Sequence, residues 1–224
     1  MLRTIRAIIL ILFLFSVGLS AQQKDFQFWP SLAVNLEVAP NLKLQVEEEV
    51  RFHENVSQLG RQINDLGASY RFNKFLKAGI FYRLEADWKN ADDYSWRNGV
   101  YGDVALRHKL NRITAGYRLR LQSAKVDRNT EEYLFDSFRH RHKVSIEYDV
   151  KGIPLIPFVE AELFIDSRKG TEAIRSWIGL DYKVRKIHTL SLKYGIDKEV
   201  HVNDPLTAYI IALGYTLDLS LVSK

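Results

Sequence analysis

Apolar and polar residues alternate along most of the chain. Between Ala78 and Ala86, for example, Ile80, Tyr82 and Leu84 alternate with small, aromatic or charged residues. A period of two places successive side chains on opposite faces of a β-strand. The pattern predicts eleven strands, near residues 26–38, 42–52, 61–72, 75–87, 97–109, 112–122, 138–150, 153–165, 174–184, 187–198 and 206–219. Most of them exceed the usual strand length of about 5–6 residues, so we expect an all-β chain with long strands.

The connections between these segments alternate in length. Short turns fall at Pro40-Asn41, Asn73-Lys74, Leu110-Asn111, Lys151-Gly152 and Arg185-Lys186, and longer polar segments fill residues 53–60, 88–96, 123–137, 166–173 and 199–205. Short periplasmic turns and longer extracellular loops are typical of transmembrane β-barrels. The sequence therefore predicts a single antiparallel up-and-down transmembrane β-barrel over residues 22–224, without an internal domain boundary.

The number of strands conflicts with this architecture. Single-chain bacterial barrels have an even number of strands, with both termini in the periplasm. We therefore expect 10 or 12 strands rather than eleven. Either residues 26–38, which contain Pro30, do not form a full wall strand, or residues 123–137 contain an additional one.

The first 21 residues have the pattern of a secretory signal peptide. Arg3 and Arg6 precede an apolar run from Ala7 to Phe15, and small residues lead up to Ala21. The run is shorter than the roughly 20 residues that a membrane-spanning helix needs. We expect residues 1–21 to be cleaved and the remaining chain to reach the cell outer membrane of a Gram-negative bacterium.

Tyrosines on the apolar face suggest a membrane boundary. Tyr70, Tyr148 and Tyr182 each lie three residues before a short turn, and Tyr215 has a similar position near the chain end. Because tyrosine favours the boundary between hydrocarbon and headgroups, these four residues predict an aromatic girdle in contact with outer-membrane lipid. The segment Gly214–Leu219 resembles the C-terminal targeting signal of bacterial outer-membrane barrels, which implies the barrel-assembly machinery as a partner.

Several short motifs resemble one bacterial protein family. They are Phe28-Trp29, Glu49-x-Arg51-Phe52, Tyr70-Arg71-Phe72-Asn73-Lys74, Arg139-x-Arg141 and Pro157-Phe158-x-Glu160-x-Glu162. Together they resemble the exported domain-of-unknown-function family numbered 2490. This resemblance implies an outer-membrane barrel without an assigned activity, and it implies no catalytic residue.

The opposite face of the strands is rich in charges of both signs. The strongest candidates for a lumen cluster are Arg83, Glu85, Arg118, Arg120, Arg139, Arg141, Glu147, Glu160 and Glu162. In a narrow barrel these side chains would pair across strands and fill the interior. Alternatively, Arg118, Arg120, Arg139 and Arg141 would form a basic wall of a narrow channel for small anionic solutes.

Composition limits the other functions. Without Arg3 and Arg6 the chain has 30 basic and 27 acidic residues, a net charge of +3 that gives no reason to expect nucleic-acid binding. Because there is no cysteine, thiol catalysis and thiolate metal sites are excluded. We expect no cofactor or metal; His140 and His142 are flanked by basic residues that would repel a cation.

Two further functions remain open. The first is an outer-membrane enzyme acting on lipid or surface polymer, although the chain has no His-x-Ser or Asp-x-His motif of the known barrel lipases and proteases. The second is a soluble periplasmic barrel that binds an apolar ligand, which would place Tyr82 and Leu84 inside the cavity.

Overall fold

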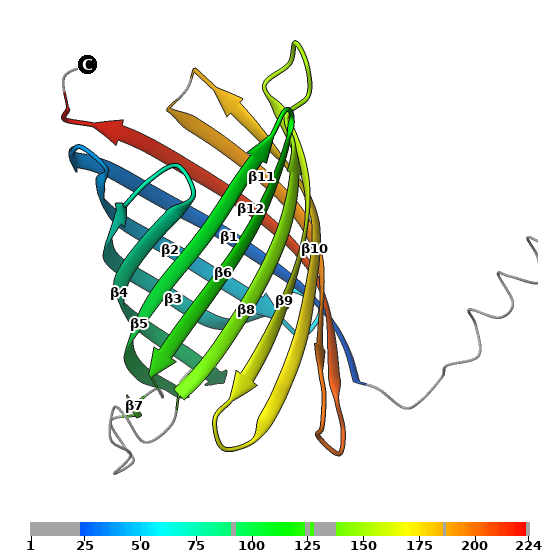
Figure 1. Ribbon diagram of the computed structural model, residues 1–224. Helices are drawn as coiled ribbons and strands as arrows, with labels where there is room; N and C mark the ends of the chain where they lie inside the picture. The colour runs from blue at the N-terminus through cyan, green and yellow to red at the C-terminus, as the bar shows by residue number, and fades with distance from the viewer. Residues whose placement is uncertain (1–22, 91–92, 124–125, 128–137, 186, 223–224) are drawn as a thin grey trace, which may run out of the picture.

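Eleven long strands form one closed β-barrel. The computed structural model describes residues 23–90, 93–123, 126–127, 138–185 and 187–222. All regular secondary structure among these residues is β-strand (Figure 1). The wall strands are β1 (Gln23–Ala39), β2 (Leu42–His53), β3 (Gln58–Arg71), β4 (Leu76–Asn90), β5 (Asp93–Leu110), β6 (Ile113–Ser123), β8 (Phe138–Tyr148), β9 (Leu155–Asp166), β10 (Gly170–Val184), β11 (His188–Glu199) and β12 (Leu206–Ser220). The short β7 (Val126–Asp127) pairs with β5 beyond the end of β6. No helix among the described residues is long and apolar enough to cross a membrane.

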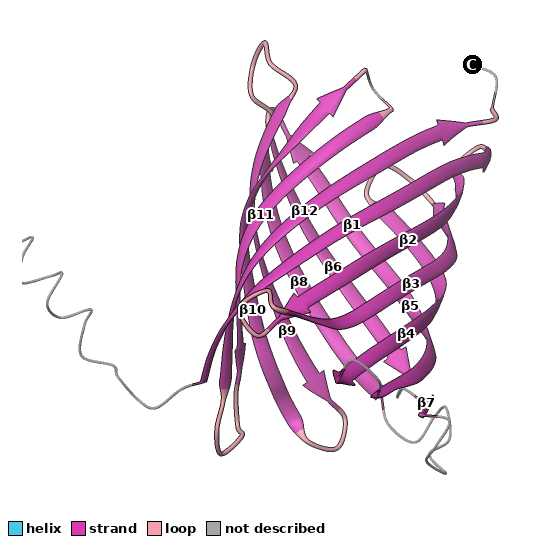
Figure 2. Cartoon of the chain, turned by 180° about the vertical axis from the view of Figure 1, so that it is seen from behind, coloured by secondary structure: helices cyan, strands magenta, loops and turns pink. Residues whose placement is uncertain are grey.

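The barrel closes through a parallel pair of strands. Neighbouring wall strands pair antiparallel around the ring, whereas β1 and β12 pair in parallel from Gln23 opposite Leu206 to Glu37 opposite Ser220. Figure 2 shows β12, β1 and β2 side by side. The expectation of 10 or 12 wall strands is therefore wrong. An odd number of strands closes a ring when one pair is parallel, and Gln23 and Ser220 then lie at opposite ends of the barrel.

Pro30 does not prevent β1 from being a full wall strand. The pairing between β1 and β2 is interrupted from Phe28, opposite Phe52, to Ser31, opposite Glu49. Proline has no N–H to donate to a strand ladder. Because Pro30 lies within the interruption, its missing donor removes no bond to β2, and the parallel pairing with β12 continues past it.

The prediction of longer loops at one end is wrong for several hairpins. β4 and β5 remain paired as far as Asn90 opposite Asp93, and residues 54–57 and 167–169 are all that separate β2 from β3 and β9 from β10. Residues expected in loops, such as Trp88 and Tyr94, continue these ladders, so the strands extend beyond the segments predicted from the apolar alternation. The connection at 200–205 is longer, and much of segment 123–137 lies outside the described residues.

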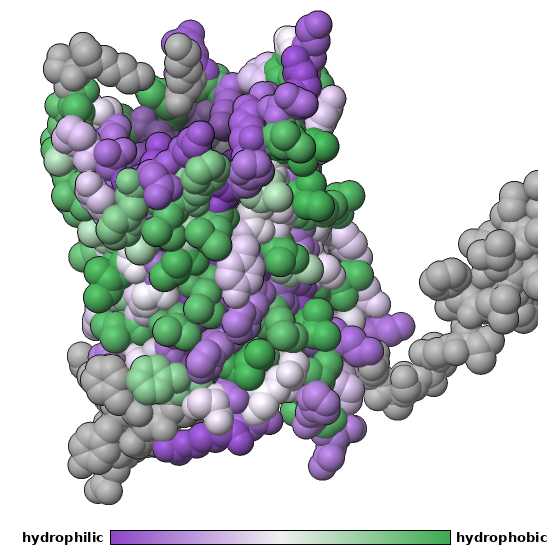
Figure 3. Space-filling model, viewed as in Figure 1, coloured by the Kyte–Doolittle hydropathy of each residue, from purple (hydrophilic) through white to green (hydrophobic). Residues whose placement is uncertain are grey.

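The two faces of the wall have opposite chemistry. Large apolar side chains cover the outside, where Ile80 is 67% exposed and Ile178 60% exposed. Figure 3 shows hydrophobic residues across the middle of the barrel surface and hydrophilic ones towards both ends. Charged side chains fill the inside, and Glu85, Arg120 and Glu162 are buried there. The period of two therefore separates an apolar exterior from a charged lumen. The predicted signal peptide at residues 1–21 lies outside the described residues.

Candidate functional site

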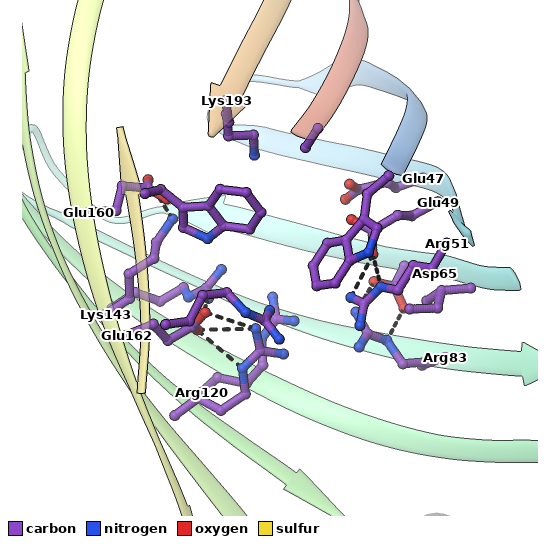
Figure 4. A pocket seen from close by; sticks show the side chains of 17 residues that line it. Glu47, Glu49, Arg51, Asp65, Arg83, Arg120, Lys143, Glu160, Glu162 and Lys193 are labelled. Atoms are coloured by element: carbon purple, nitrogen blue, oxygen red, sulfur yellow. Dashed lines mark hydrogen bonds and ion pairs between the residues drawn. The ribbon is translucent and has the colours of Figure 1, made fainter. Parts of the chain in front are cut away.

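A central cavity of about 160 Å³ lies in the lumen between two groups of charged side chains. The β2–β4 group consists of Glu47, Glu49, Arg51, Asp65 and Arg83. The β6–β11 group consists of Arg118, Arg120, Arg141, Lys143, Glu160, Glu162, Arg175 and Lys193. Figure 4 shows labelled members of both groups on opposite sides of an open centre, with Lys193 between them.

Ion pairs organise the β6–β11 group. The Glu162 carboxylate accepts a hydrogen bond from Arg118 at 2.7 Å and two from Arg141 at 3.1 Å. Lys143 donates to Glu160 at 2.8 Å. These contacts follow from the register, in which Lys143 is opposite Arg118 on one side and opposite Glu162 on the other. Alternate residues of neighbouring strands thus meet inside the barrel.

Asp103 completes this network from outside the cavity lining. Arg120 donates two hydrogen bonds of 2.7 Å to its carboxylate, and the two residues are direct neighbours on β5 and β6. A bidentate pair fixes the guanidinium plane as well as its position. Arg120 is therefore held against the wall rather than extended into the cavity.

The β2–β4 group is organised around Asp65. Arg83 donates two hydrogen bonds to the Asp65 carboxylate, at 2.7 and 2.6 Å, and the Tyr101 hydroxyl donates a third at 2.8 Å. On β2, Arg51 donates to Glu49 at 2.7 Å. Among the described residues, Glu47 has no ion-pair partner within 4.0 Å, although it faces the same cavity.

Two tryptophans divide the lumen along its length. The rings of Trp29 and Trp177 are 5.8 Å apart and inclined at 67°. The Arg51 guanidinium lies 3.8 Å from the Trp29 ring centre, and that of Arg175 lies 4.9 Å from it. Trp29 also lines a second cavity of about 240 Å³ towards the end of the barrel where β1 begins. Trp29 and the two arginines thus form a partition between the two cavities.

Inward glycines make room for the aromatic rings. Gly195 is directly opposite Trp177, and a Cβ added to it would lie 2.3 Å from a ring carbon. Gly67 is opposite Phe81 in the same way, and its Cβ would also lie 2.3 Å from a ring carbon. These rings therefore lie across the backbone of the neighbouring strand.

Two further cavities lie at the end of the barrel where β1 and β12 finish. One, of about 290 Å³, contains the ion pairs Arg107–Glu147 and Lys109–Asp149. The other, of about 220 Å³, is lined by polar residues that include Lys43. Neither shares a lining residue with the central cavity. The central cavity and these two cavities are therefore lined by separate sets of residues.

The structure brings together six of the nine lumen residues named from the sequence. The six that line the central cavity are Arg83, Arg118, Arg120, Arg141, Glu160 and Glu162. Glu85 is buried with its carboxylate 3.6 Å from Arg83. Arg139 and Glu147 lie towards opposite ends, paired with Glu172 and Arg107. The four arginines of the predicted basic wall therefore do not share one cavity.

Sequence reasoning missed the tryptophan partition. Trp177 lies two residues after Arg175 and next to the outward Ile178, so the alternation along β10 places Trp177 on the inward face with Arg175. The alternation therefore contained the signal, but an aromatic residue at an inward position was not distinguished from an outward one. Lys193 was missed for lack of a motif around it.

The girdle tyrosines lie on the outer surface. Tyr70, Tyr148 and Tyr182 are exposed, and Tyr215 is half-buried with its hydroxyl 2.6 Å from His188 Nδ1. Tyr182 and Tyr215 are both opposite Leu190, so they share one level of the wall.

Other aromatic residues cluster on the outside towards the opposite end. Trp88, Tyr94 and Trp96 form a chain of ring contacts with centroid distances of 6.1 and 6.0 Å. Phe28 stacks on Phe52 at 6.4 Å. Aromatic side chains therefore occur near both ends of the outer apolar surface.

The histidines of β8 face outward. His142 Nδ1 is 2.8 Å from the Tyr117 hydroxyl, which lies on the same outer face. The described part of the chain has no group of three or more His, Asp or Glu side chains placed to hold a metal ion.

Comparisons with known proteins identify a family and a distant structural likeness. The family described as "Protein of unknown function (DUF2490)" matches residues 26–199, from β1 to the end of β11. No curated protein matches. A solved structure described as "Bacterial polysaccharide outer membrane secretin" is similar with 10% sequence identity and a TM-score of 0.37, covering 75% of this chain and 72% of that chain. The chain therefore belongs to the DUF2490 family of proteins of unknown function.

Proposed function

We propose that the protein is an outer-membrane β-barrel, exported by a signal peptide at residues 1–21, with a lumen held closed by ion pairs and a structural or interaction role rather than an enzymatic one. The observation that carries the proposal is the inversion of the two faces of the wall. Exposed apolar side chains surround the barrel while buried charges fill it. An apolar surface of this extent is unfavourable in water and favourable in lipid.

The aromatic residues support membrane insertion. Tyr70, Tyr148, Tyr182 and Tyr215 lie on the outside near one end of the barrel, and the Trp88–Tyr94–Trp96 chain lies near the other. Such residues settle at the two membrane interfaces. A surface in contact with lipid has such aromatic residues at both of its edges, with apolar residues between them. We therefore propose outer-membrane lipid as the partner of this surface.

The lumen chemistry argues against a soluble barrel with an apolar ligand inside. That alternative requires Tyr82 and Leu84 to line the cavity, but Tyr82 is exposed on the outside together with Ile80. The central cavity is lined mainly by charged residues. The protein would therefore offer an apolar ligand little favourable surface within the lumen.

Detergent dependence and gel mobility test the membrane proposal. We expect the chain to be recovered from outer-membrane fractions only with detergent, and to migrate differently before and after boiling, because a closed barrel resists unfolding by the gel detergent. Replacing the outward Ile80, Val144 and Ile178 with Lys should reduce insertion into lipid vesicles. The inward Lys43→Gln variant is the matched control. Recovery of the wild-type chain as a soluble periplasmic monomer would refute the proposal.

The C-terminal strand is the proposed contact with the barrel-assembly machinery. The segment Gly214–Leu219 lies near the end of β12, which pairs with both β11 and β1. Removing residues 214–219 should therefore prevent assembly of the barrel. Unchanged insertion of the shortened chain in cells would refute this role.

A narrow channel for small anionic solutes is the second candidate function. Its support is the surplus of cationic side chains in the β6–β11 group, where six basic residues face two acidic ones in the cavity lining. Planar-bilayer recordings with salts of different anions separate the two candidates. A closed lumen predicts silence, whereas stable anion-selective conductance that Arg118→Gln and Arg139→Gln abolish would establish the channel.

A further inference from the structure

The charges around the central cavity are segregated across the lumen. When the ion-pair partners Asp103 and Asp197 are included, the β6–β11 side has six basic and four acidic side chains. With the neighbouring Glu85 included, the β2–β4 side has two basic and four acidic ones. The surplus positive charge therefore lies on one wall of the cavity rather than being neutralised beside each residue.

The surplus positive charge is located at the side chains of Arg118, Arg141 and Lys193. One carboxylate, that of Glu162, serves both Arg118 and Arg141. Lys193 has an ammonium group 5.5 Å from the Trp177 ring centre, and within the described residues no carboxylate oxygen lies within 4.0 Å of it. Two guanidinium groups share one carboxylate, and the ammonium group of Lys193 has no direct ion-pair partner among the described residues, so this wall of the cavity leaves room for another negative charge.

Buried hydrogen-bond donors point to the same conclusion. Arg118 Nε and Arg175 Nε are both shielded from solvent and have no hydrogen-bond acceptor among the described residues. An unsatisfied donor on a charged group is costly when it is buried. Both arginines line the cavity, so a ligand there could supply the missing acceptors.

The size of the cavity restricts the ligand. A volume of about 160 Å³ has room for several water molecules. This space admits a small oxyanion but not an extended polymer or a lipid chain. Trp29, Arg51 and Arg175 line both this cavity and the second one and lie between the two.

We infer that the central cavity is a binding site for a small oxyanion, a carboxylate or a phosphate, held by Arg118, Arg141 and Lys193. Glu162 occupies part of the same donor set and therefore competes with the ligand. The site rests on the closed lumen of the proposed function and does not require insertion into a membrane.

Tryptophan fluorescence provides a direct test on the full mature chain folded in detergent micelles. The sequence has four tryptophans, of which Trp29 and Trp177 line the cavity. In a Trp88→Phe, Trp96→Phe background the emission reports only on the cavity. Titration with inorganic phosphate, and separately with sodium acetate, at ionic strength held constant with chloride should give a saturable change. The preferred probe distinguishes the phosphate from the carboxylate class, and choline chloride should give no change.

Opposite effects of two substitutions distinguish a binding site from a structural ion-pair cluster. Because a hydrogen bond to a charged group contributes about tenfold or more in affinity, Arg141→Gln should weaken binding by about tenfold, and so should Lys193→Gln, which breaks no ion pair. Glu162→Gln should strengthen binding by a similar factor, since it removes the competitor. Arg71→Gln, at the rim and outside the cavity lining, is the control and should leave the affinity unchanged.

The results also separate this inference from the proposed function. Heat-modifiable gel mobility establishes that each variant is folded. A folded wild-type barrel that inserts into vesicles but gives no saturable change overturns the anion site alone. Weaker binding in Glu162→Gln, parallel to that in Arg141→Gln, also overturns it. Saturable binding by a chain that is soluble without detergent refutes the membrane proposal and leaves the anion site standing.

Discussion

Replacing Trp29 with alanine removes the central side chain of the partition between the two inner cavities. Trp29 is 4% exposed and packs against Trp177, and the guanidinium groups of Arg51 and Arg175 lie 3.8 and 4.9 Å from its ring centre. Truncating a buried tryptophan to alanine costs about 3–5 kcal/mol in general. Part of this is the ring–ring contact, worth about 0.5–1.5 kcal/mol, and part is cation–π attraction, up to about 2 kcal/mol where it is desolvated.

Urea unfolding of the folded barrel in detergent micelles measures this loss. We expect Trp29→Ala to lower the free energy of unfolding by about 3–5 kcal/mol. The unfolding is monitored by circular dichroism and by gel mobility without boiling. Trp96→Ala is the matched control, because Trp96 is on the outside and 38% exposed. Its substitution should cost clearly less.

A double-mutant cycle with Trp177→Ala isolates the contact between the two rings. The coupling free energy should be about 0.5–1.5 kcal/mol. A loss below about 1 kcal/mol for Trp29→Ala, or a cycle with no coupling, would refute the description of Trp29 as a packed partition, because a ring merely projecting into water would leave stability almost unchanged.

Three further substitutions test the packing and the charges of the lumen. Gly195→Ala places a Cβ 2.3 Å from the Trp177 ring, so it should destabilise the barrel by about 1–3 kcal/mol and alter tryptophan emission; unchanged emission would contradict the close approach. Arg83→Gln removes the bidentate partner of the buried Asp65 and should cost about 3–5 kcal/mol in urea unfolding. By contrast, Lys109→Gln at the rim, where the side chain is 59% exposed, should lower the free energy of unfolding by at most about 1 kcal/mol. Equal losses in Arg83→Gln and Lys109→Gln would show that burial does not govern the strength of these two ion pairs.

Local pattern was sufficient for the strands and for their facing. The segment expected near 138–150 is β8, Phe138–Tyr148, and the segment expected near 187–198 is β11, His188–Glu199. The alternation within a single strand is enough to show which of its side chains share a face. For the same reason Arg118 and Glu162 could be placed in one lumen before any contact between them was known.

The closure of the ring could not be derived in this way. The parallel pairing of β1 with β12 joins residues near the two ends of the chain, and no local pattern reports on it. The expectation of an even number of strands came from a rule that holds for single-chain bacterial outer-membrane barrels. It failed because the rule assumes that every neighbouring pair is antiparallel.

The sequence by itself determined the all-β architecture, the apolar and charged faces and the membership of one lumen, because side-chain alternation is a property of each strand. Only the tertiary structure decided which charges pair, that Glu162 is shared by two arginines, and that Trp29 meets Trp177 beside Gly195. These contacts depend on register, strand closure and the space left by neighbouring residues, which are set by the whole ring rather than by any segment of it.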